Sequence, residues 1–134
     1  KNGNRITGDL VNNYILEKEK IELTGKYWKL VELNGQVVEV ENREPFIKFN
    51  QEEKLVNGNS SCNSFNGKYE ILEGNKISFS PFMMTKMACI GNNTENEFMQ
   101  AFEATTGYLL SVNTLVLTDS SEKILAKFEA DFLK

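Results

Sequence analysis

The sequence contains no histidine, only two cysteines and only two prolines among its 134 residues. Histidine is the side chain used most often for acid–base catalysis near neutral pH, and it is the commonest metal ligand. Its absence excludes Ser-His-Asp and Cys-His nucleophile pairs and histidine-based zinc sites, while two cysteines are too few for a four-thiolate zinc site. What remains for catalysis is a carboxylate pair, lysine or tyrosine. Since the carboxylates are unpaired and there is no phosphate-binding loop, we expect no catalytic residue, no metal ligand and no cofactor.

Long apolar runs and an excess of positive charge are missing as well. No apolar run approaches the roughly 18 residues needed to span a bilayer. Since the sequence begins at Lys1 with no apolar h-region, we expect either a cytosolic chain or a mature form whose targeting segment was removed. Fifteen basic and nineteen acidic residues give a net charge of −4, which argues against a nucleic-acid partner because phosphate binding needs a basic face.

Carboxylates are concentrated in one stretch, which is a solvated edge and turn or a hard-cation site. The members are Glu39, Glu41, Glu44, Glu52 and Glu53. Calcium loops place their ligands at alternate positions around a glycine turn, and this stretch does not. We favour the solvated edge.

The chain divides into a polar N-terminal tether or arm, residues 1–22, and one domain, residues 23–134. Short strand patterns occupy residues 27–33, 36–40, 46–50, 54–56, 68–73, 76–80, 108–112, 114–118 and 123–128. Asn34-Gly35 and Gly74-Asn75 are typical of two-residue hairpin turns. A capping box from Thr94 to Glu97 begins one helix, expected near residues 95–106, and Gly107 is predicted to stop it. This pattern predicts an antiparallel α+β domain.

Two apolar features have alternative interpretations. Phe98, Phe102, Thr105 and Leu109 form a stripe at helical spacing, which indicates core packing rather than a ligand-facing surface. Residues 81–88 gather three of the four methionines, which fill core gaps or line an adaptable apolar groove.

Two segments hold the cysteines, Ser61-Cys-Asn-Ser-Phe-Asn-Gly-Lys-Tyr69 and Thr85-Lys-Met-Ala-Cys89. Together with the opening strand and turn, residues 23–35, they resemble the META domain, or HslJ-like, family. Its corresponding segments run Gly-Cys-Asn-x-Phe-x-Gly-x-Tyr and Thr-x-Met-Ala-Cys, so Ser61 stands where glycine is usual. The resemblance covers residues 23 to about 130.

The resemblance implies a strongly curved, barrel-like antiparallel β-sheet with one principal packed α-helix. It also implies a bacterial cell-envelope protein associated with heat shock, which is a lipoprotein in many members and carries no established enzymatic activity. We therefore expect a non-enzymatic, monomeric binding or chaperone-like module, similar to pilotins, for an envelope protein or apolar ligand. A possible lipid anchor would lie upstream of Lys1. The alternatives are a purely structural envelope protein without a ligand pocket and, least favoured, an enzyme.

Three sets of site residues follow. In an oxidising envelope Cys62 and Cys89 are natural disulfide partners, although two buried free thiols remain the alternative. The signature turn has a structural interpretation, with a ligand-binding loop as the alternative, and its residues are Asn63, Phe65, Gly67 and Tyr69. A candidate apolar cleft between sheet and helix is assigned to Met84, Met87, Phe98 and Phe102.

Overall fold

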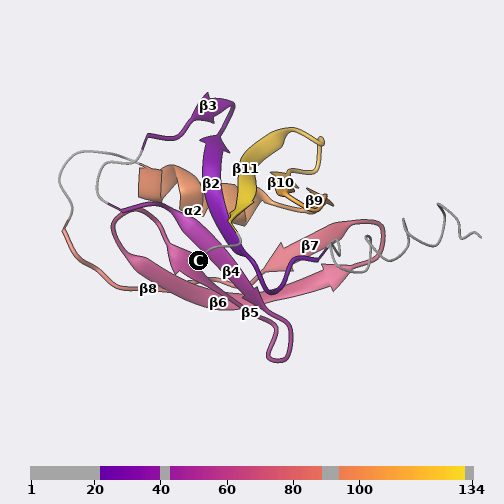
Figure 1. The fold of residues 1–134 in the computed structure, drawn as a ribbon, viewed down its shortest axis with the longest axis horizontal. Helices are drawn as coiled ribbons and strands as arrows, with labels where there is room; N and C mark the ends of the chain where they lie inside the picture. The colour runs from indigo at the N-terminus through magenta and orange to yellow at the C-terminus, as the bar shows by residue number, and fades with distance from the viewer. Residues whose placement is uncertain (1–21, 40–42, 89–93, 132–134) are drawn as a thin grey trace, which may run out of the picture.

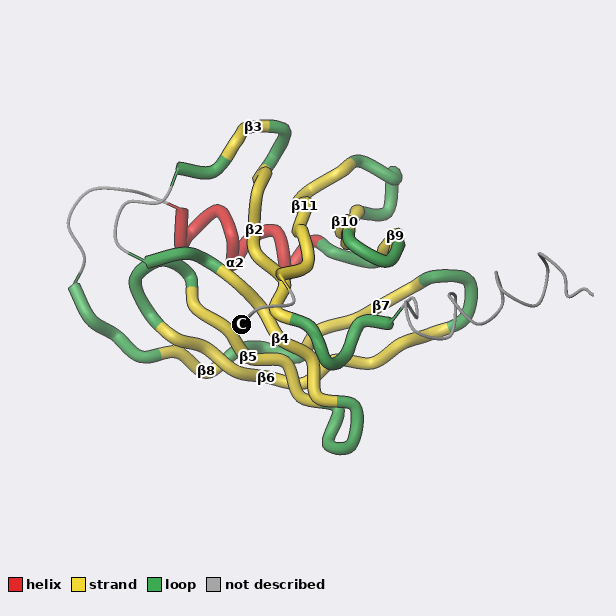
Figure 2. Tube along the Cα trace, in the orientation of Figure 1, coloured by secondary structure: helices red, strands yellow, loops and turns green. Residues whose placement is uncertain are grey.

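A computed structural model describes residues 22–39, 43–88 and 94–131. The expected tether, residues 1–22, lies outside the described residues except for Glu22. The fold is a barrel of eight antiparallel strands with one helix in the described part, α2 (Thr94–Ala104), and this confirms the predicted fold class (Figures 1 and 2). The barrel strands are β2 (Tyr27–Leu33), β4 (Phe46–Asn50), β5 (Leu55–Asn59), β6 (Ser64–Leu72), β7 (Lys76–Phe79), β9 (Gly107–Leu110), β10 (Thr114–Thr118) and β11 (Ile124–Asp131). Two short strands, β3 (Gln36–Val37) and β8 (Met83–Met84), pair with β2 and β6.

The seams of the barrel differ in length. Strands β2 and β11 pair from Leu33 opposite Ala126 to Tyr27 opposite Asp131, and this pairing closes the barrel. Strands β7 and β9, by contrast, are partners only at Lys76 and Gly107. Beyond this point β7 runs beside the helix, since the ring of its Phe79 packs edge-on against Phe102 of α2 at 5.0 Å. The β7–β9 seam is therefore short, and Phe102 of α2 packs against β7 beyond it.

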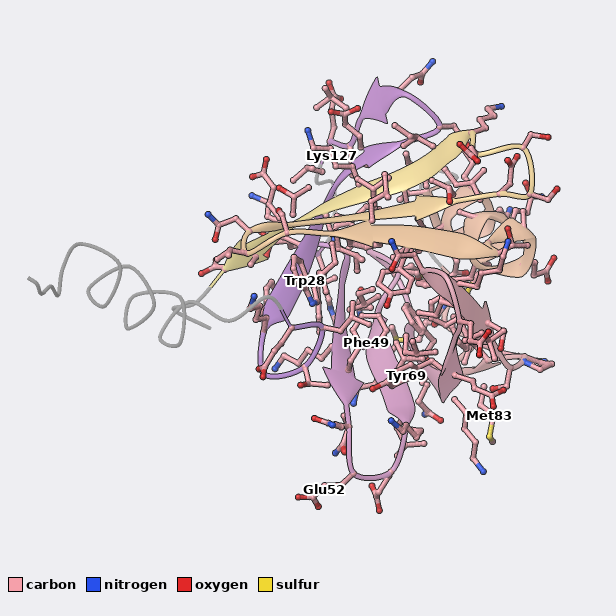
Figure 3. All side chains as sticks on the ribbon, turned by 90° about the vertical axis from the view of Figure 1, so that its right-hand side faces the viewer. Trp28, Phe49, Glu52, Tyr69, Met83 and Lys127 are labelled. Carbon is pink, nitrogen blue, oxygen red and sulfur yellow. The ribbon has the colours of Figure 1, made fainter. Side chains whose placement is uncertain are left out.

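The core follows from the alternation of side chains along the strands. On β2, Trp28, Leu30 and Leu33 are buried whereas the residues between them are partly exposed. The Trp28 side chain is fully enclosed and its indole N–H donates a hydrogen bond of 2.8 Å to the Leu23 carbonyl, so its one polar group is satisfied (Figure 3).

The two predicted hairpin turns differ from each other. Asn34 and Gly35 have φ of +52° and +82° and connect the paired Leu33 and Gln36, as expected for a type I′ turn. The second turn has three residues between the paired Leu72 and Lys76 rather than two. The register there places Tyr69 opposite Phe79, which keeps both rings on the core side and leaves the extra residue in the turn.

Helix α2 packs through one apolar face, which confirms its predicted position but not its predicted end. Phe98, Ala101 and Phe102 are buried, and Phe98 contacts Phe128 of β11 with 5.9 Å between ring centroids. The helix ends at Ala104, and Gly107 begins β9 instead of stopping the helix.

Gly107 has a packing role rather than a helix-stopping role. A Cβ there would lie 3.0 Å from the Thr118 hydroxyl oxygen of the paired strand β10. Leu109, predicted on the helical stripe, lies on β9 and is 56% exposed. The sequence periodicity therefore continued past the true end of the helix.

Candidate functional site

Asn63 is the centre of a buried hydrogen-bond network. Its amide oxygen accepts hydrogen bonds from the Met87 backbone N–H at 2.7 Å and from the Thr85 hydroxyl at 2.8 Å. Its amide nitrogen lies 3.0 Å and 3.2 Å from the two carboxylate oxygens of Glu95 and 3.3 Å from the Met87 carbonyl. Since the side chain is 3% exposed, these contacts replace its hydration. Asn63 thus joins the loop before β6 to residues 85–87 and to the first turn of α2.

Ser60 completes the same network. Its hydroxyl donates a hydrogen bond to Glu95 and accepts one of 3.1 Å from the Asn63 backbone N–H. Glu95 lies in the first turn of α2, where a negative charge also interacts favourably with the helix dipole. The network fixes the start of the helix on the loop.

Ser61 is strained and has an unsatisfied side chain. Its φ is +87°, which lies in the left-handed region that favours glycine. Its hydroxyl oxygen is buried and has no hydrogen-bond partner among the described residues. The position where this chain departs from the glycine of the family signature is therefore one where glycine is the better residue.

The predicted signature turn is a turn only in part, because β6 begins at Ser64. Phe65 and Tyr69 lie on β6 and are buried in the core, and Tyr69 packs edge-on against Phe49 at 4.9 Å. Gly67 lies between them, and a Cβ there would come within 2.3 Å of the Phe82 ring. Only glycine therefore allows Phe82 to lie against this strand, where its ring also stacks on Phe65 at 5.0 Å.

An apolar groove of about 350 Å³ lies where the segment after β7 meets the last turns of α2. It is lined by Phe79, Ser80, Pro81, Phe82, Met84, Met99, Phe102 and Glu103. Phe79, Phe82 and Phe102 contact one another edge to face, with centroids 4.8–6.0 Å apart. The groove has the size of the smaller ligand pockets in proteins and their predominantly apolar lining.

The four residues assigned to the apolar cleft separate into two pairs. Met84 and Phe102 line the groove. Phe98 is fully buried behind it, and Met87 is 50% exposed and interacts with Asn63 through its backbone, so neither lines the groove.

Sequence reasoning did not assign the other six lining residues to the cleft, namely Phe79, Ser80, Pro81, Phe82, Met99 and Glu103. Met99 and Glu103 follow Glu95 at steps of four residues along the helix, which is a periodicity that the sequence displays. Phe82 lies in the segment between β7 and β8, and its position depends on its contact with Gly67 of β6, which no local pattern signals.

Cys62 is disulfide-bonded, and no free cysteine occurs among the described residues. Its sulfur lies 3.6 Å from the Met87 carbonyl. Cys89 falls outside the described residues, so its pairing with Cys62 stays a prediction.

The glutamates of the acidic stretch lie in different parts of the structure. Glu44 accepts a hydrogen bond of 2.8 Å from the Tyr27 hydroxyl and lies 3.6 Å from the Lys29 ammonium. Glu52 and Glu53 lie in the turn between β4 and β5, and Glu41 falls outside the described residues. Within residues 22–39, 43–88 and 94–131, no three acidic or cysteine side chains gather as metal ligands.

The profile of the META domain matches residues 21–132. The chain belongs to the META domain family. No curated protein matches the chain. In this META domain the signature asparagine is the centre of the buried network, and the signature glycine lies beneath Phe82.

Three solved structures are similar to this META domain. One NMR structure has a TM-score of 0.66 at 23% identity and covers 83% of this chain and 93% of its own. The crystal structure of a DUF4847-family protein from Bacteroides vulgatus has a TM-score of 0.64 at 14% identity, covering 86% and 96%. An NMR structure of a protein from Burkholderia xenovorans has a TM-score of 0.63 at 20% identity, covering 81% and 83%. At these identities the similarity shows the fold alone.

Proposed function

We propose that this META domain is a non-enzymatic binding module that holds an apolar group in the groove between residues 79–84 and helix α2. The observation that carries the proposal is the groove itself, about 350 Å³ with three phenylalanines and two methionines in its lining. Burying an apolar group of phenyl size against such a lining is favourable by about 25 cal/mol for each Å² removed from water. The half-buried rings of Phe79 and Phe82 are available for that contact.

The proposal places the domain in the bacterial cell envelope, where it binds an apolar ligand or an apolar segment of an envelope protein. The disulfide bond of Cys62 supports this, because disulfides persist in oxidising compartments and are rare in the cytosol. Among the described residues no helix has the length and hydropathy to cross a membrane. Blocking thiols in intact cells before denaturation tests the compartment, since modification of both cysteines would contradict it.

The four methionines give a direct test of the groove, because they divide evenly between groove and surroundings. Met84 and Met99 line the groove, whereas Met83 is 74% and Met87 50% exposed outside it. Titration with 3-phenylpropanol, followed by NMR of ¹³C-methyl-labelled methionines, is expected to shift the Met84 and Met99 signals and to leave those of Met83 and Met87 in place. Ten non-hydrogen atoms set an expected Kd of about 1 mM or somewhat below.

Two aspartate substitutions distinguish binding in the groove from nonspecific binding at the surface. Met84→Asp is expected to abolish the shift of the Met99 signal, because a carboxylate would have to be desolvated by the ligand. Met83→Asp introduces the same charge one residue away on an exposed side chain and is expected to leave binding unchanged (Figure 3). Equal shifts of all four methionine signals, or none, in the unsubstituted protein would refute the groove and favour a purely structural protein.

A further inference from the structure

Charge around the apolar groove has one sign. Among the residues that the structure describes, Glu103 in the last turn of α2 is the one charged residue in the lining, and its side chain is exposed. It makes no hydrogen bond or ion pair with any residue in the described part of the chain. A carboxylate thus lies at the edge of the groove, and no described residue forms an ion pair with it.

The other polar side chain of the groove does not provide a comparable group. The Ser80 hydroxyl accepts a hydrogen bond of 2.8 Å from the Lys68 backbone N–H and donates one of 3.3 Å to the Pro81 carbonyl. Because its one proton is already donated, it offers little to a ligand. The electrostatic preference of the groove is therefore set by Glu103.

The aromatic lining acts in the same direction as the carboxylate. Phe79, Phe82 and Phe102 form three of the walls, and the faces of aromatic rings attract cations through their quadrupole. Methionine sulfur, here from Met84 and Met99, is a polarisable neighbour for such a group. An anion would meet both an aromatic face and a like charge.

We infer that the groove takes a small organic cation, in which an ammonium group is carried on an apolar body of about phenyl size. The inference rests on the proposed function and adds the charge of the occupant. The apolar body contacts the rings and methionines, and the ammonium lies beside the Glu103 carboxylate.

Three probes of equal carbon skeleton test the charge preference: 3-phenylpropylammonium, 3-phenylpropanol and 3-phenylpropionate. An exposed ion pair and an exposed cation–π contact each raise affinity by about two- to fivefold. We therefore expect the ammonium to bind about five- to tenfold more tightly than the alcohol, and the carboxylate to bind most weakly. The signals of Met84 and Met99 report all three titrations.

Glu103→Gln removes the charge with little change of shape and is expected to reduce the advantage of the ammonium over the alcohol to about twofold. Glu52→Gln removes the same charge from the tip of the turn between β4 and β5, outside the groove lining, and is expected to leave that advantage intact (Figure 3). Raising the salt concentration to about 0.5 M should reduce the advantage in the unsubstituted protein, since exposed charges are screened.

The outcomes for the inference and for the proposed function are distinct. If alcohol and ammonium shift Met84 and Met99 with equal affinity, or if Glu103→Gln leaves the ammonium's advantage unchanged, the inference is overturned while the groove remains. If none of the three probes shifts these signals in the unsubstituted protein, the proposed function itself is wrong.

Discussion

Ser61→Gly is expected to stabilise the domain, because two unfavourable features meet at this one side chain. A non-glycine residue in the left-handed region carries about 1–3 kcal/mol of backbone strain, and Ser61 has φ of +87°. A buried polar group without a partner adds about 1–3 kcal/mol, and the Ser61 hydroxyl is such a group. Both penalties disappear when the side chain is removed.

One effect opposes the gain. Glycine gains conformational freedom in the unfolded chain, which lowers stability by roughly 0.5–1 kcal/mol. Taking the lower end of each favourable contribution leaves a net stabilisation of about 1 kcal/mol, and the middle of each range gives about 3 kcal/mol. For a domain of this size, 1 kcal/mol raises the thermal midpoint by about 4 °C.

Urea denaturation and thermal unfolding of the oxidised protein measure the effect, and two variants divide it. Ser61→Ala removes the hydroxyl but keeps the strained φ, so it should give only the hydroxyl's share of the gain. Ser60→Gly, one residue earlier, should be destabilising because the Ser60 hydroxyl binds Glu95 and the Asn63 N–H. A Ser61→Gly protein that is no more stable than the unsubstituted one would refute the argument from strain and the unsatisfied hydroxyl.

Three further predictions concern other positions. Asn63→Ala should lower the free energy of unfolding by about 2–4 kcal/mol in urea denaturation, because it leaves buried hydrogen-bond partners unsatisfied. Asn66→Ala, on the exposed side of β6, should change it by less than about 0.5 kcal/mol. Equal effects of the two substitutions would contradict the network. Gly67→Ala should destabilise by about 1–3 kcal/mol and weaken probe binding, since its Cβ overlaps the Phe82 ring, and a binding isotherm identical to that of the unsubstituted protein would exclude that contact. Burial and the hydrogen bond to a carboxylate raise the pKa of the Tyr27 hydroxyl, so the folded state holds this proton more tightly than the unfolded state and stability should fall as pH rises above about 10. Tyr27→Phe should reduce that fall between pH 9 and 11, and an unchanged pH profile would contradict the assignment.

The strands and turns were predictable where local chemistry decides them. Apolar and polar side chains alternate along residues 27–33 and 46–50, and the structure has β2 and β4 with these bounds. The Asn34-Gly35 turn was predictable because both residues tolerate positive φ. The turn of the second hairpin has one residue more than predicted, because its register depends on which aromatic rings face the core. That register is set by tertiary packing and not by the local sequence.

Long-range contacts account for what the sequence did not reveal. Residues 64–67 looked like a loop because they are rich in Asn, Ser and Gly, yet they form the first part of β6, pair with β5 and include the buried Phe65. Gly107 looked like a helix stop, but its lack of a side chain serves the contact with Thr118. The groove was predicted between helix and residues 81–88, and the residues placed in it were partly core because helical spacing does not distinguish Phe98 from Phe102.

The signature residues Asn63 and Gly67 hold the segments that form the groove. Asn63 binds the first turn of α2 through Glu95 and the segment after β8 through Met87, which fixes the helix and the chain that face each other across the groove. Gly67, four residues later, provides the surface on which Phe82 lies as one wall. Glu103, by contrast, is exposed and makes no hydrogen bond or ion pair with a described residue, so we expect its substitution to leave the fold intact. The framework therefore sets the position of the groove, and under the proposed function the residues at its edge would set which ligand it binds.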